Sequence, residues 1–318
     1  SIGVKNKTMF VVPGSVLSNW RREASRAYAS TDDCLFVGLN IDAKGNATVN
    51  PADYARDFNR VLENRHSKIF CTVEAFKLIP VKDSTLNAYE DYMTTVDDAF
   101  ERSASRKDSE ATENKLAELT GASGGSGAVP FLEDMGVDSL VMDEAHAFKN
   151  SKNADFANAK FLSNPETSAR GLDAQIKAWY IRSLSDKRDG VLALTATPIT
   201  NSPVEIYAML SMAVGDERVN NMMMGARGVS AFMDVVCDIE DGEEDGIDGL
   251  PRSTRIFRGL RNVQLLRGML SAVATIRTAS DSGLDLPQAD EKPTRVVLPD
   301  AVSTRLRTYR DAYVAARY

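Results

Sequence analysis

Short apolar runs alternate along the chain with stretches of helical periodicity. The runs lie at residues 8–13, 34–39, 68–73, 138–143 and 190–197. Helical segments are expected to begin between them, near residues 15, 50 and 168. Strands that alternate with helices in this way typically form a mainly parallel sheet flanked by helices. We therefore predict an α/β fold, with Trp20 of the first helix in the core.

Two segments depart from this alternation. Residues 82–128 are polar and helix-prone and end in GASGGSGAV, which predicts an inserted helical hairpin on a flexible tether. From residue 214 onward the strands stop, and we expect helices together with an acidic loop at residues 238–249. These shifts divide the chain into a lobe at residues 1–213 and a helical extension at residues 214–318.

The extension carries a group of arginines within the stretch RSTRIFRGLRNVQLL. Helical spacing would place Arg255, Arg258 and Arg261 opposite an apolar face that includes Ile256. Such a group is either a solvated basic face or a surface that contacts phosphates or an acidic partner. The acidic loop of the same chain is one candidate for that partner.

Composition narrows the class of protein. The chain has 318 residues, 43% of them hydrophobic and 26% charged, which is ordinary for a soluble globular protein. The net charge of −7 argues against a protein that coats nucleic acid through a uniformly basic surface, but it leaves local binding open. Three scattered cysteines and two histidines favour a reducing compartment and give zinc few ligands. No apolar run is long enough to span a bilayer, so we expect a cytoplasmic protein without a membrane partner.

Chemistry enters with SLVMDEAHAFKN, at residues 139–150. Its apolar run predicts a buried strand that ends at Asp143 and Glu144. Nucleotide chemistry in open α/β sheets takes place at this end of the strands. One carboxylate could hold a Mg²⁺ ion that bridges nucleotide phosphates, and the second could activate the attacking water. A surface acidic turn is the alternative explanation of this motif.

A second polar motif follows the next predicted strand, in LTATPITNSPVEIYAML at residues 194–210. Thr195 and Thr197 are expected at the same edge of the sheet as Asp143. The stretch from Ser202 to Glu205 predicts a capping box at the start of a helix. Two polar motifs on neighbouring strand ends are more specific than either motif alone.

Together these motifs resemble the first motor lobe of superfamily 2 DEAD/DEAH-type helicases, most closely the Swi/Snf-type ATP-dependent DNA translocases. VVPGSVLSNWRREASRAY is similar to motif Ia of that family, and IFCTVEAF is similar to motif Ib. DEAHAFKN resembles motif II, and LTATPITNSPVEIYAML resembles motif III. The end of the chain is similar to the passage out of lobe 1, where a helix carries a tyrosine. The resemblance covers nearly the whole chain apart from the two inserted segments.

The resemblance implies a RecA-like lobe that uses ATP and Mg²⁺ and acts on duplex DNA. It assigns Asp143 to Mg²⁺, through water, and Glu144 to water activation. It assigns the coupling of nucleotide state to DNA contact to His146, Thr195 and Thr197. It assigns contacts with the DNA backbone to Ser15, Asn19 and Thr72.

The chain also departs from the family pattern. No glycine-rich phosphate loop occurs in it, and the second lobe with its arginine fingers is missing. We therefore expect a fragment of a larger protein that is inactive alone and depends on an upstream phosphate-loop segment and a downstream lobe 2. Loss of the phosphate-loop strand predicts an unpaired sheet edge, closed by rearrangement or by self-association.

The leading hypothesis is a lobe of an ATP-dependent DNA helicase or translocase. The insertion and the brief motifs favour a phage or mobile-element protein connected with restriction, antirestriction or a fused methyltransferase. A second hypothesis is a non-catalytic DNA-binding scaffold that keeps the fold, although retention of both Asp143 and Glu144 speaks against it. A third is another phosphohydrolase, which the DNA-facing motifs disfavour.

Overall fold

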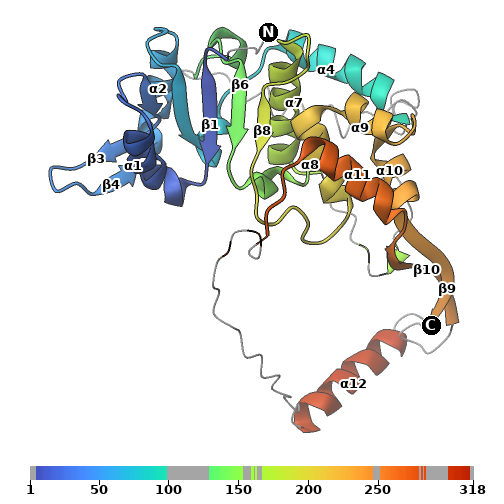
Figure 1. The fold of residues 1–318 in the computed structure, drawn as a ribbon. Helices are drawn as coiled ribbons and strands as arrows, with labels where there is room; N and C mark the ends of the chain where they lie inside the picture. Colours follow the sequence, from blue (N-terminus) through green and yellow to red (C-terminus); the bar gives the residue numbers. More distant parts are fainter. Residues whose placement is uncertain are drawn as a thin grey trace.

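A computed structural model describes residues 5–98, 129–152, 159–160, 162, 167–245, 251–278, 281, 283 and 300–315. Its centre is a five-stranded sheet with the order β2-β5-β1-β6-β8, and every pairing in it is parallel (Figure 1). The strands are β1 (Thr8–Val12), β2 (Cys34–Phe36), β5 (Lys68–Thr72), β6 (Ser139–Met142) and β8 (Val191–Ala193). All five lie within the predicted runs, so the predicted α/β fold is confirmed.

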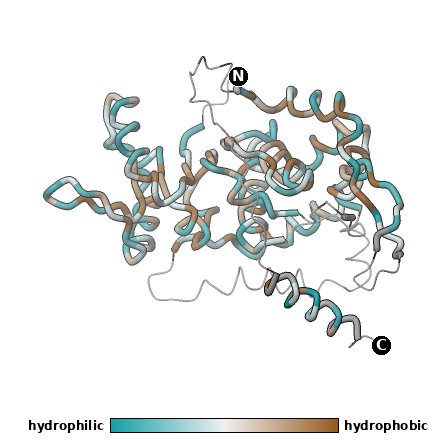
Figure 2. The backbone as a smooth tube through the Cα atoms, turned by 90° about the horizontal axis from the view of Figure 1, so that it is seen from below, coloured by the Kyte–Doolittle hydropathy of each residue, from teal (hydrophilic) through white to brown (hydrophobic). Residues whose placement is uncertain are grey.

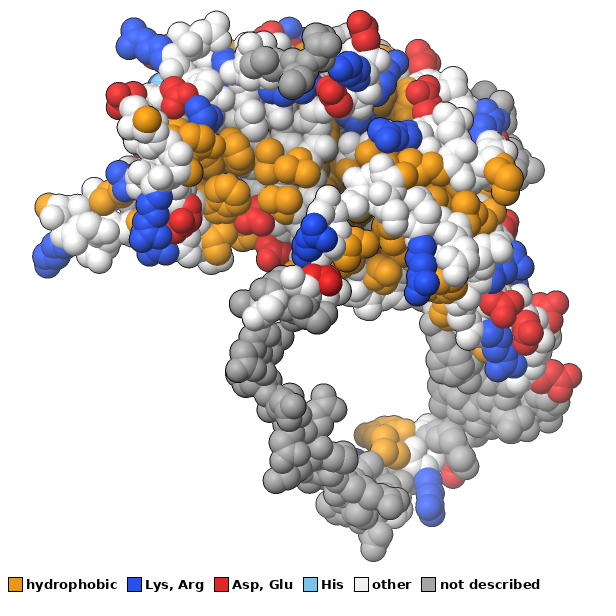
Figure 3. All heavy atoms as spheres, viewed as in Figure 1, with side chains coloured by type: hydrophobic (Ala, Val, Ile, Leu, Met, Phe, Trp, Pro, Cys, Tyr) orange, Lys and Arg blue, Asp and Glu red, His pale blue; other side chains and the backbone are white. Residues whose placement is uncertain are grey.

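The two faces of this sheet are covered unequally. Met9 and Val11 of β1 point into the main core, which also contains side chains from α2 (Tyr54–Val61), α3 (Val73–Phe76), α4 (Asp83–Val96) and α7 (Ala169–Ser183). Phe10 and Val12 alternate to the other face, where α1 (Leu17–Ala27) supplies a smaller cluster. Leu192 of β8 is 53% exposed. Figure 3 shows hydrophobic side chains gathered over this open part of the sheet.

β8 forms one edge of the sheet, and no strand in the described part of the chain pairs with its free side. The five strands are contiguous because β6 pairs directly with β8, so the sheet contains no gap. An edge at β8 is compatible with the expected loss of a phosphate-loop strand, but every open sheet has two edges, so that expectation stays a prediction. Self-association at this edge stays a prediction.

A second core lies beside the sheet, and α8 (Val204–Val214) supplies several of its buried side chains. Tyr207 and Phe232 pack tilted at its centre, with ring centroids 5.4 Å apart. The other helices of this core are α9 (Asp216–Met222), α10 (Gly228–Val236) and α11 (Val263–Val273). Figure 2 shows apolar segments in the middle of the molecule and polar ones on the outer loops.

Residues 237–260 correct two predictions. Residues 238–245 of the expected acidic loop belong to the strand β9 (Cys237–Asp245), and residues 246–249 of that loop lie outside the described residues. The expected arginine-bearing helix begins as the strand β10 (Pro251–Leu260). They form an antiparallel hairpin in which Arg255 lies opposite Asp241, and β7 (Ala159–Lys160) adds a third strand. Opposite charges on facing strands stabilise the pairing. The β-branched and aromatic residues of β10 favour a strand over the helix that the arginine spacing suggested.

Other predictions are met in part. α4 begins the predicted insertion, and residues 99–128 of that insertion lie outside the described residues. The hairpin of β3 (Leu39–Ile41) and β4 (Ala47–Val49), which projects from the body in Figures 1 and 2, was not predicted. The predicted tyrosine-bearing helix is α12 (Asp300–Ala315), and residues 284–299 before it lie outside the described residues. Short 3-10 helices complete the structure: η1 (Gly14–Val16), η2 (Pro51–Asp53), η3 (Leu132–Asp134) and η4 (Ala145–Phe148).

Candidate active site at the carboxyl ends of β6 and β8

Two backbone hydrogen bonds hold the predicted motifs side by side at one edge of the sheet. The Asp143 amide donates to the Val11 carbonyl at 2.8 Å, which extends the pairing of β6 with β1. The Ala145 amide donates to the Leu194 carbonyl at 2.8 Å, which ties the end of β6 to the end of β8. The candidate metal carboxylate and the threonines after β8 therefore share one edge, as the sequence predicted.

Asp143 is half-buried and each of its carboxylate oxygens accepts a hydrogen bond. Trp20 of α1 donates from Nε1 to Oδ2 at 2.9 Å, and the Glu144 amide donates to Oδ1 at 3.1 Å. The Trp20 ring packs against Phe10 and Phe70, with centroid distances of 5.8 Å and 6.0 Å. Trp20 is thus partly a core residue, as predicted, but the sequence analysis missed its contact with Asp143. No local pattern signals this contact, because it depends on the pairing of β1 beside β6.

Glu144 and His146 form the next part of the site. Glu144 adopts the left-handed conformation, with φ 51° and ψ 49°, which non-glycine residues rarely occupy and which often marks functional positions. The His146 Nδ1 atom lies 3.1 Å from Glu144 Oε2 and 3.3 Å from Thr195 Oγ1. His146 therefore connects the candidate base to the motif after β8.

The motif after β8 is held by a buried carboxylate. Thr195 Oγ1 accepts from the Thr197 amide at 3.1 Å. Further on, Glu205 is fully buried, pairs with Lys149 at 3.0 Å and accepts from the Thr200 amide at 2.6 Å. Burial alone would raise the pKa of Glu205, but the Thr200 amide and Lys149 together hold that pKa below its ordinary value.

This arrangement corrects the predicted capping box. Ser202 Oγ accepts from the Val204 amide at 3.3 Å, but Glu205 reaches back to the amides of Thr200 and Asn201 rather than to that of Ser202. The cause is the ion pair with Lys149, which draws the carboxylate toward the end of η4. Glu205 therefore links the segment after Asp143 to the segment after β8, a role that the sequence analysis did not assign.

The three predicted DNA-contact positions differ in accessibility. Ser15 in η1 and Asn19 in α1 are exposed, on the segment that follows β1 toward the Trp20 side of the site. Thr72 is 1% exposed; its hydroxyl accepts from the Ala75 amide at 3.1 Å and lies 3.2 Å from Tyr54 Oη. Thr72 therefore caps α3, and a direct DNA contact by its side chain stays a prediction.

The arginines of residues 251–261 lie away from this site, on the sheet of order β7-β10-β9. Arg258 pairs with Glu240 at 3.1 Å, and Arg261 donates to the Asp234 carbonyl. Arg255 is half-buried beside Asp241. The predicted acidic partner is thus within the same hairpin, and the pattern of contacts differs from the predicted helical face.

The donor set suits Mg²⁺ with ATP better than a metal held by protein alone. Mg²⁺ favours oxygen ligands and usually keeps water and phosphate oxygens in its shell. Asp143 offers carboxylate oxygens, and the described residues include no group of three or more His, Cys, Asp or Glu that could hold a metal ion. A metal at Asp143 would therefore need phosphate and water oxygens to complete its shell.

Among the described residues, no helix is both long and apolar enough to cross a membrane.

Comparisons with known proteins indicate a helicase-like family. The family model described as a probable helicase domain matches residues 40–222, more than half of the chain. That range contains β5, β6 and β8 with Asp143, Glu144 and Thr195. The chain is also similar to the "Defense against restriction protein B" of Escherichia phage P1, at 27% identity over 330 aligned positions. The alignment covers 91% of this chain but 14% of that relative, so the chain corresponds to a small part of it.

Proposed function

The chain belongs to the probable helicase domain family, and from that membership we propose that it forms the first motor lobe of an ATP-dependent DNA translocase of the Swi/Snf-like type. The observation that carries the proposal is the connected group of Asp143, Glu144, His146 and Thr195 across two neighbouring strand ends. Such an edge is where nucleotides are bound and hydrolysed in α/β proteins.

Each residue of this group has a task in the proposal. A Mg²⁺ ion bound with ATP would supply electrostatic stabilisation of the phosphate charge. Asp143 would hold such an ion through water, and Trp20 fixes the carboxylate of Asp143 by its hydrogen bond of 2.9 Å. Glu144 accepts the proton of the attacking water. Because His146 contacts both Glu144 and Thr195, a change at the phosphates can alter the segment after β8.

The open edge of β8 supports the proposal that a further strand completes the lobe. Leu192 and Leu194 are 53% and 37% exposed, and apolar side chains on an unpaired edge are a liability unless another element covers them. A phosphate-loop strand from the longer protein, followed by its helix, would cover this edge and bring the phosphate-binding amides to the side of Asp143. The relative's much greater length is compatible with such a segment.

Duplex DNA is the proposed track. Ser15 in η1 and Asn19 in the first turn of α1 are exposed neutral donors, and neutral donors at such positions suit phosphate contacts. Asn19 directly precedes Trp20, so α1 carries both a candidate DNA contact and the residue that holds Asp143. We further propose, from the printed name of the phage relative, that the motor serves protection of DNA against restriction.

ATP hydrolysis by the intact protein that carries this chain, with and without duplex DNA, tests the proposal. Wild type should hydrolyse ATP faster with DNA, and Glu144→Gln should lower kcat by about 10²–10⁴-fold because it removes the general base. Glu63→Gln is the matched control, since Glu63 is exposed and lies before β5. Binding of ATP without turnover in wild type would instead favour the alternative, a non-catalytic scaffold that keeps the helicase fold.

A further inference from the structure

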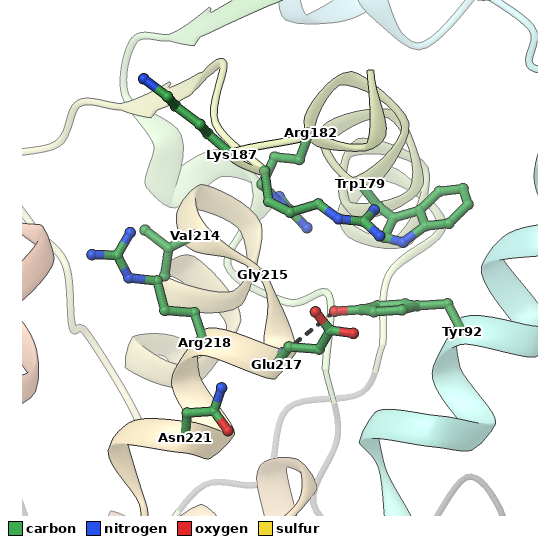
Figure 4. Close-up of a pocket in the computed structure, with 10 residues that line it drawn as sticks. Tyr92, Trp179, Arg182, Lys187, Val214, Gly215, Glu217, Arg218 and Asn221 are labelled. Atoms are coloured by element: carbon green, nitrogen blue, oxygen red, sulfur yellow. Dashed lines mark hydrogen bonds between the residues drawn. The ribbon is translucent and has the colours of Figure 1, made fainter. Parts of the chain in front are cut away.

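A pocket of about 220 Å³ lies at the opposite end of the sheet from Asp143. Its walls come from the end of α7, the loop before β8, the turn between α8 and α9, and α4 (Figure 4). Arg188 precedes β8 whereas Thr195 follows it, so the length of a parallel strand separates this pocket from the candidate active site. The proposed function assigns no role to this pocket.

The lining is strongly basic. Four cations, Arg182, Lys187, Arg188 and Arg218, and one carboxylate, Glu217, line the pocket. Arg188 and Arg218 are exposed, and neither has an ion pair with a residue that the structure describes. The carboxylate of Asp216, next to Glu217, contacts Lys152 at 2.9 Å and the Tyr207 hydroxyl at 3.1 Å through Oδ1, while its Oδ2 atom has no hydrogen-bond partner among the described residues. Among the described residues that line the pocket, cations therefore outnumber carboxylates, while Asp189 in the adjacent loop is paired with Lys5 at 2.7 Å.

Arg182 is the buried member of this group. It is 2% exposed, its Nη1 atom donates to the Met212 carbonyl, and its buried Nη2 atom has no hydrogen-bond partner among the described residues. Burial lowers the pKa of the Arg182 guanidinium; Asp216 opposes that shift, and the charge of Arg188 adds to it. A buried donor without a partner is costly, and an anion would relieve both this cost and the repulsion between the arginines.

Aromatic rings form the other wall. The rings of Tyr92 and Trp179 lie 5.7 Å apart between centroids, and Trp179 Nε1 is a second buried donor without a partner in the described structure. In Figure 4 the Arg182 guanidinium lies beside the Trp179 indole, with the Tyr92 hydroxyl and the Glu217 side chain facing them. Glu217 approaches Tyr92 through its backbone amide, which donates to the Tyr92 hydroxyl at 3.4 Å. Unused donors therefore converge on the pocket from α7.

From this geometry we infer that the pocket binds a phosphate group through Arg182, Arg188 and Arg218. Guanidinium groups match phosphate oxygens in pairs and are the usual partners for this anion. The volume is below the roughly 300–1,000 Å³ of sites for drug-sized ligands, so it suits a single phosphate or diphosphate group. The group belongs either to a free small molecule or to a nucleic acid that reaches this end of the lobe.

Hydrogen–deuterium exchange on the intact protein tests this inference, because it locates binding in the sequence. Inorganic pyrophosphate is the first probe and a single-stranded oligonucleotide is the second. Binding in the pocket should slow exchange in peptides covering residues 183–190 and 214–221. Arg188→Gln with Arg218→Gln should weaken this protection about tenfold or more in ligand concentration, since two charge-assisted contacts are lost. Both arginines are exposed, so the double variant should fold.

Arg65→Gln is the matched control, because its side chain is 80% exposed and does not line the pocket. Protection by pyrophosphate supports a small-molecule source, and protection by the oligonucleotide alone supports a nucleic-acid source. In both cases the protection from exchange must disappear in the double variant and persist in Arg65→Gln. Absence of protection with both probes at millimolar concentration, or protection that the double variant retains, would overturn the inference. Neither outcome depends on ATP hydrolysis at Asp143.

Discussion

Polar groups are arranged differently in two regions of the molecule. One is the α7 side of the central sheet, and the other is the carboxyl ends of its strands around Asp143, which we call the rim. Beneath α7, Lys177 is fully buried and donates to Asp173 and to the Phe76 carbonyl, both at 2.7 Å. Its Nζ atom also lies 4.5 Å from the Phe76 ring centroid. At the rim, Asp143 and Glu144 are half-buried, and the Glu144 side chain is 45% exposed. Lys177 therefore serves the fold, whereas the rim keeps capacity for a ligand.

The largest effect on folding is expected from Lys177→Met, which tests the α7 side of this comparison. Removal of the ammonium leaves the carboxylate of Asp173, which is 6% exposed, buried without its partner. Breaking one side of a buried ion pair costs about 3–5 kcal/mol in the free energy of unfolding. The urea midpoint of the intact protein should fall accordingly.

Two further variants separate charge from packing at this position. Lys44→Met removes an exposed lysine in the turn between β3 and β4 and should leave the midpoint nearly unchanged. Lys177→Met combined with Asp173→Asn should recover part of the loss, because no buried charge remains. A loss for Lys177→Met that is no greater than that for Lys44→Met would show that the buried pair does not support the fold.

The rim is tested by Trp20→Phe, for which a smaller effect is expected. Phenylalanine keeps a ring against Phe10 and Phe70 but removes the donor that binds Asp143 Oδ2. A hydrogen bond to a charged group contributes about 1.5–3 kcal/mol. We expect kcat for ATP hydrolysis to fall about tenfold and half-saturation to need more Mg²⁺, while the urea midpoint stays close to that of wild type.

The matched control for Trp20→Phe is Ser25→Ala on the same helix. Ser25 is exposed, and its hydroxyl donates only to the Arg22 carbonyl at 2.7 Å. Its substitution should change neither the Mg²⁺ dependence nor the rate. If Trp20→Phe lowers the rate without any change in Mg²⁺ dependence, Trp20 does not act by positioning Asp143.

The two regions also explain how much could be predicted from the sequence. The strand ends that carry Asp143 and Thr195 were predicted, because an apolar run followed by polar residues leaves few alternatives. The contact of Trp20 with Asp143 was not predictable from spacing, because it depends on β1 pairing beside β6. The ion pair of Lys149 with Glu205 depends in the same way on the end of η4 and the first turn of α8, which only tertiary structure brings together.

The hairpin of β9 and β10 shows where local patterns mislead. Arginines at positions 255, 258 and 261 fit a helical period, but these residues lie in a strand and just after it. Cross-strand pairing with the acidic strand outweighs the local preference, as the contact of Arg258 with Glu240 illustrates. Glycines and like charges predicted a loop for β9 for the same reason, since a facing strand of opposite charge cannot be seen in the segment itself.

His66 differs from Lys177 because, in the described part of the chain, one of its buried ring nitrogens has no hydrogen-bond partner. Its substitution is expected to have the smallest effect, a change in how stability depends on pH. It is 8% exposed, and its Nδ1 atom has no hydrogen-bond partner among the described residues. Burial lowers the pKa of His66 below 6.5; nearby positive charges on Arg60, Arg65 and Lys7 lower it further, and Glu63 opposes them. The unfolded chain therefore takes up a proton first as the pH falls, so stability should decrease from about pH 7 through pH 6.5. His66→Gln should reduce the fall in urea midpoint between pH 7.5 and 5.5. From pH 7.5 to 8.5 the His66 imidazole should contribute little, so the midpoints of wild type and variant should not diverge further there. An equally steep fall in the variant would show that the pH dependence of stability does not come from His66.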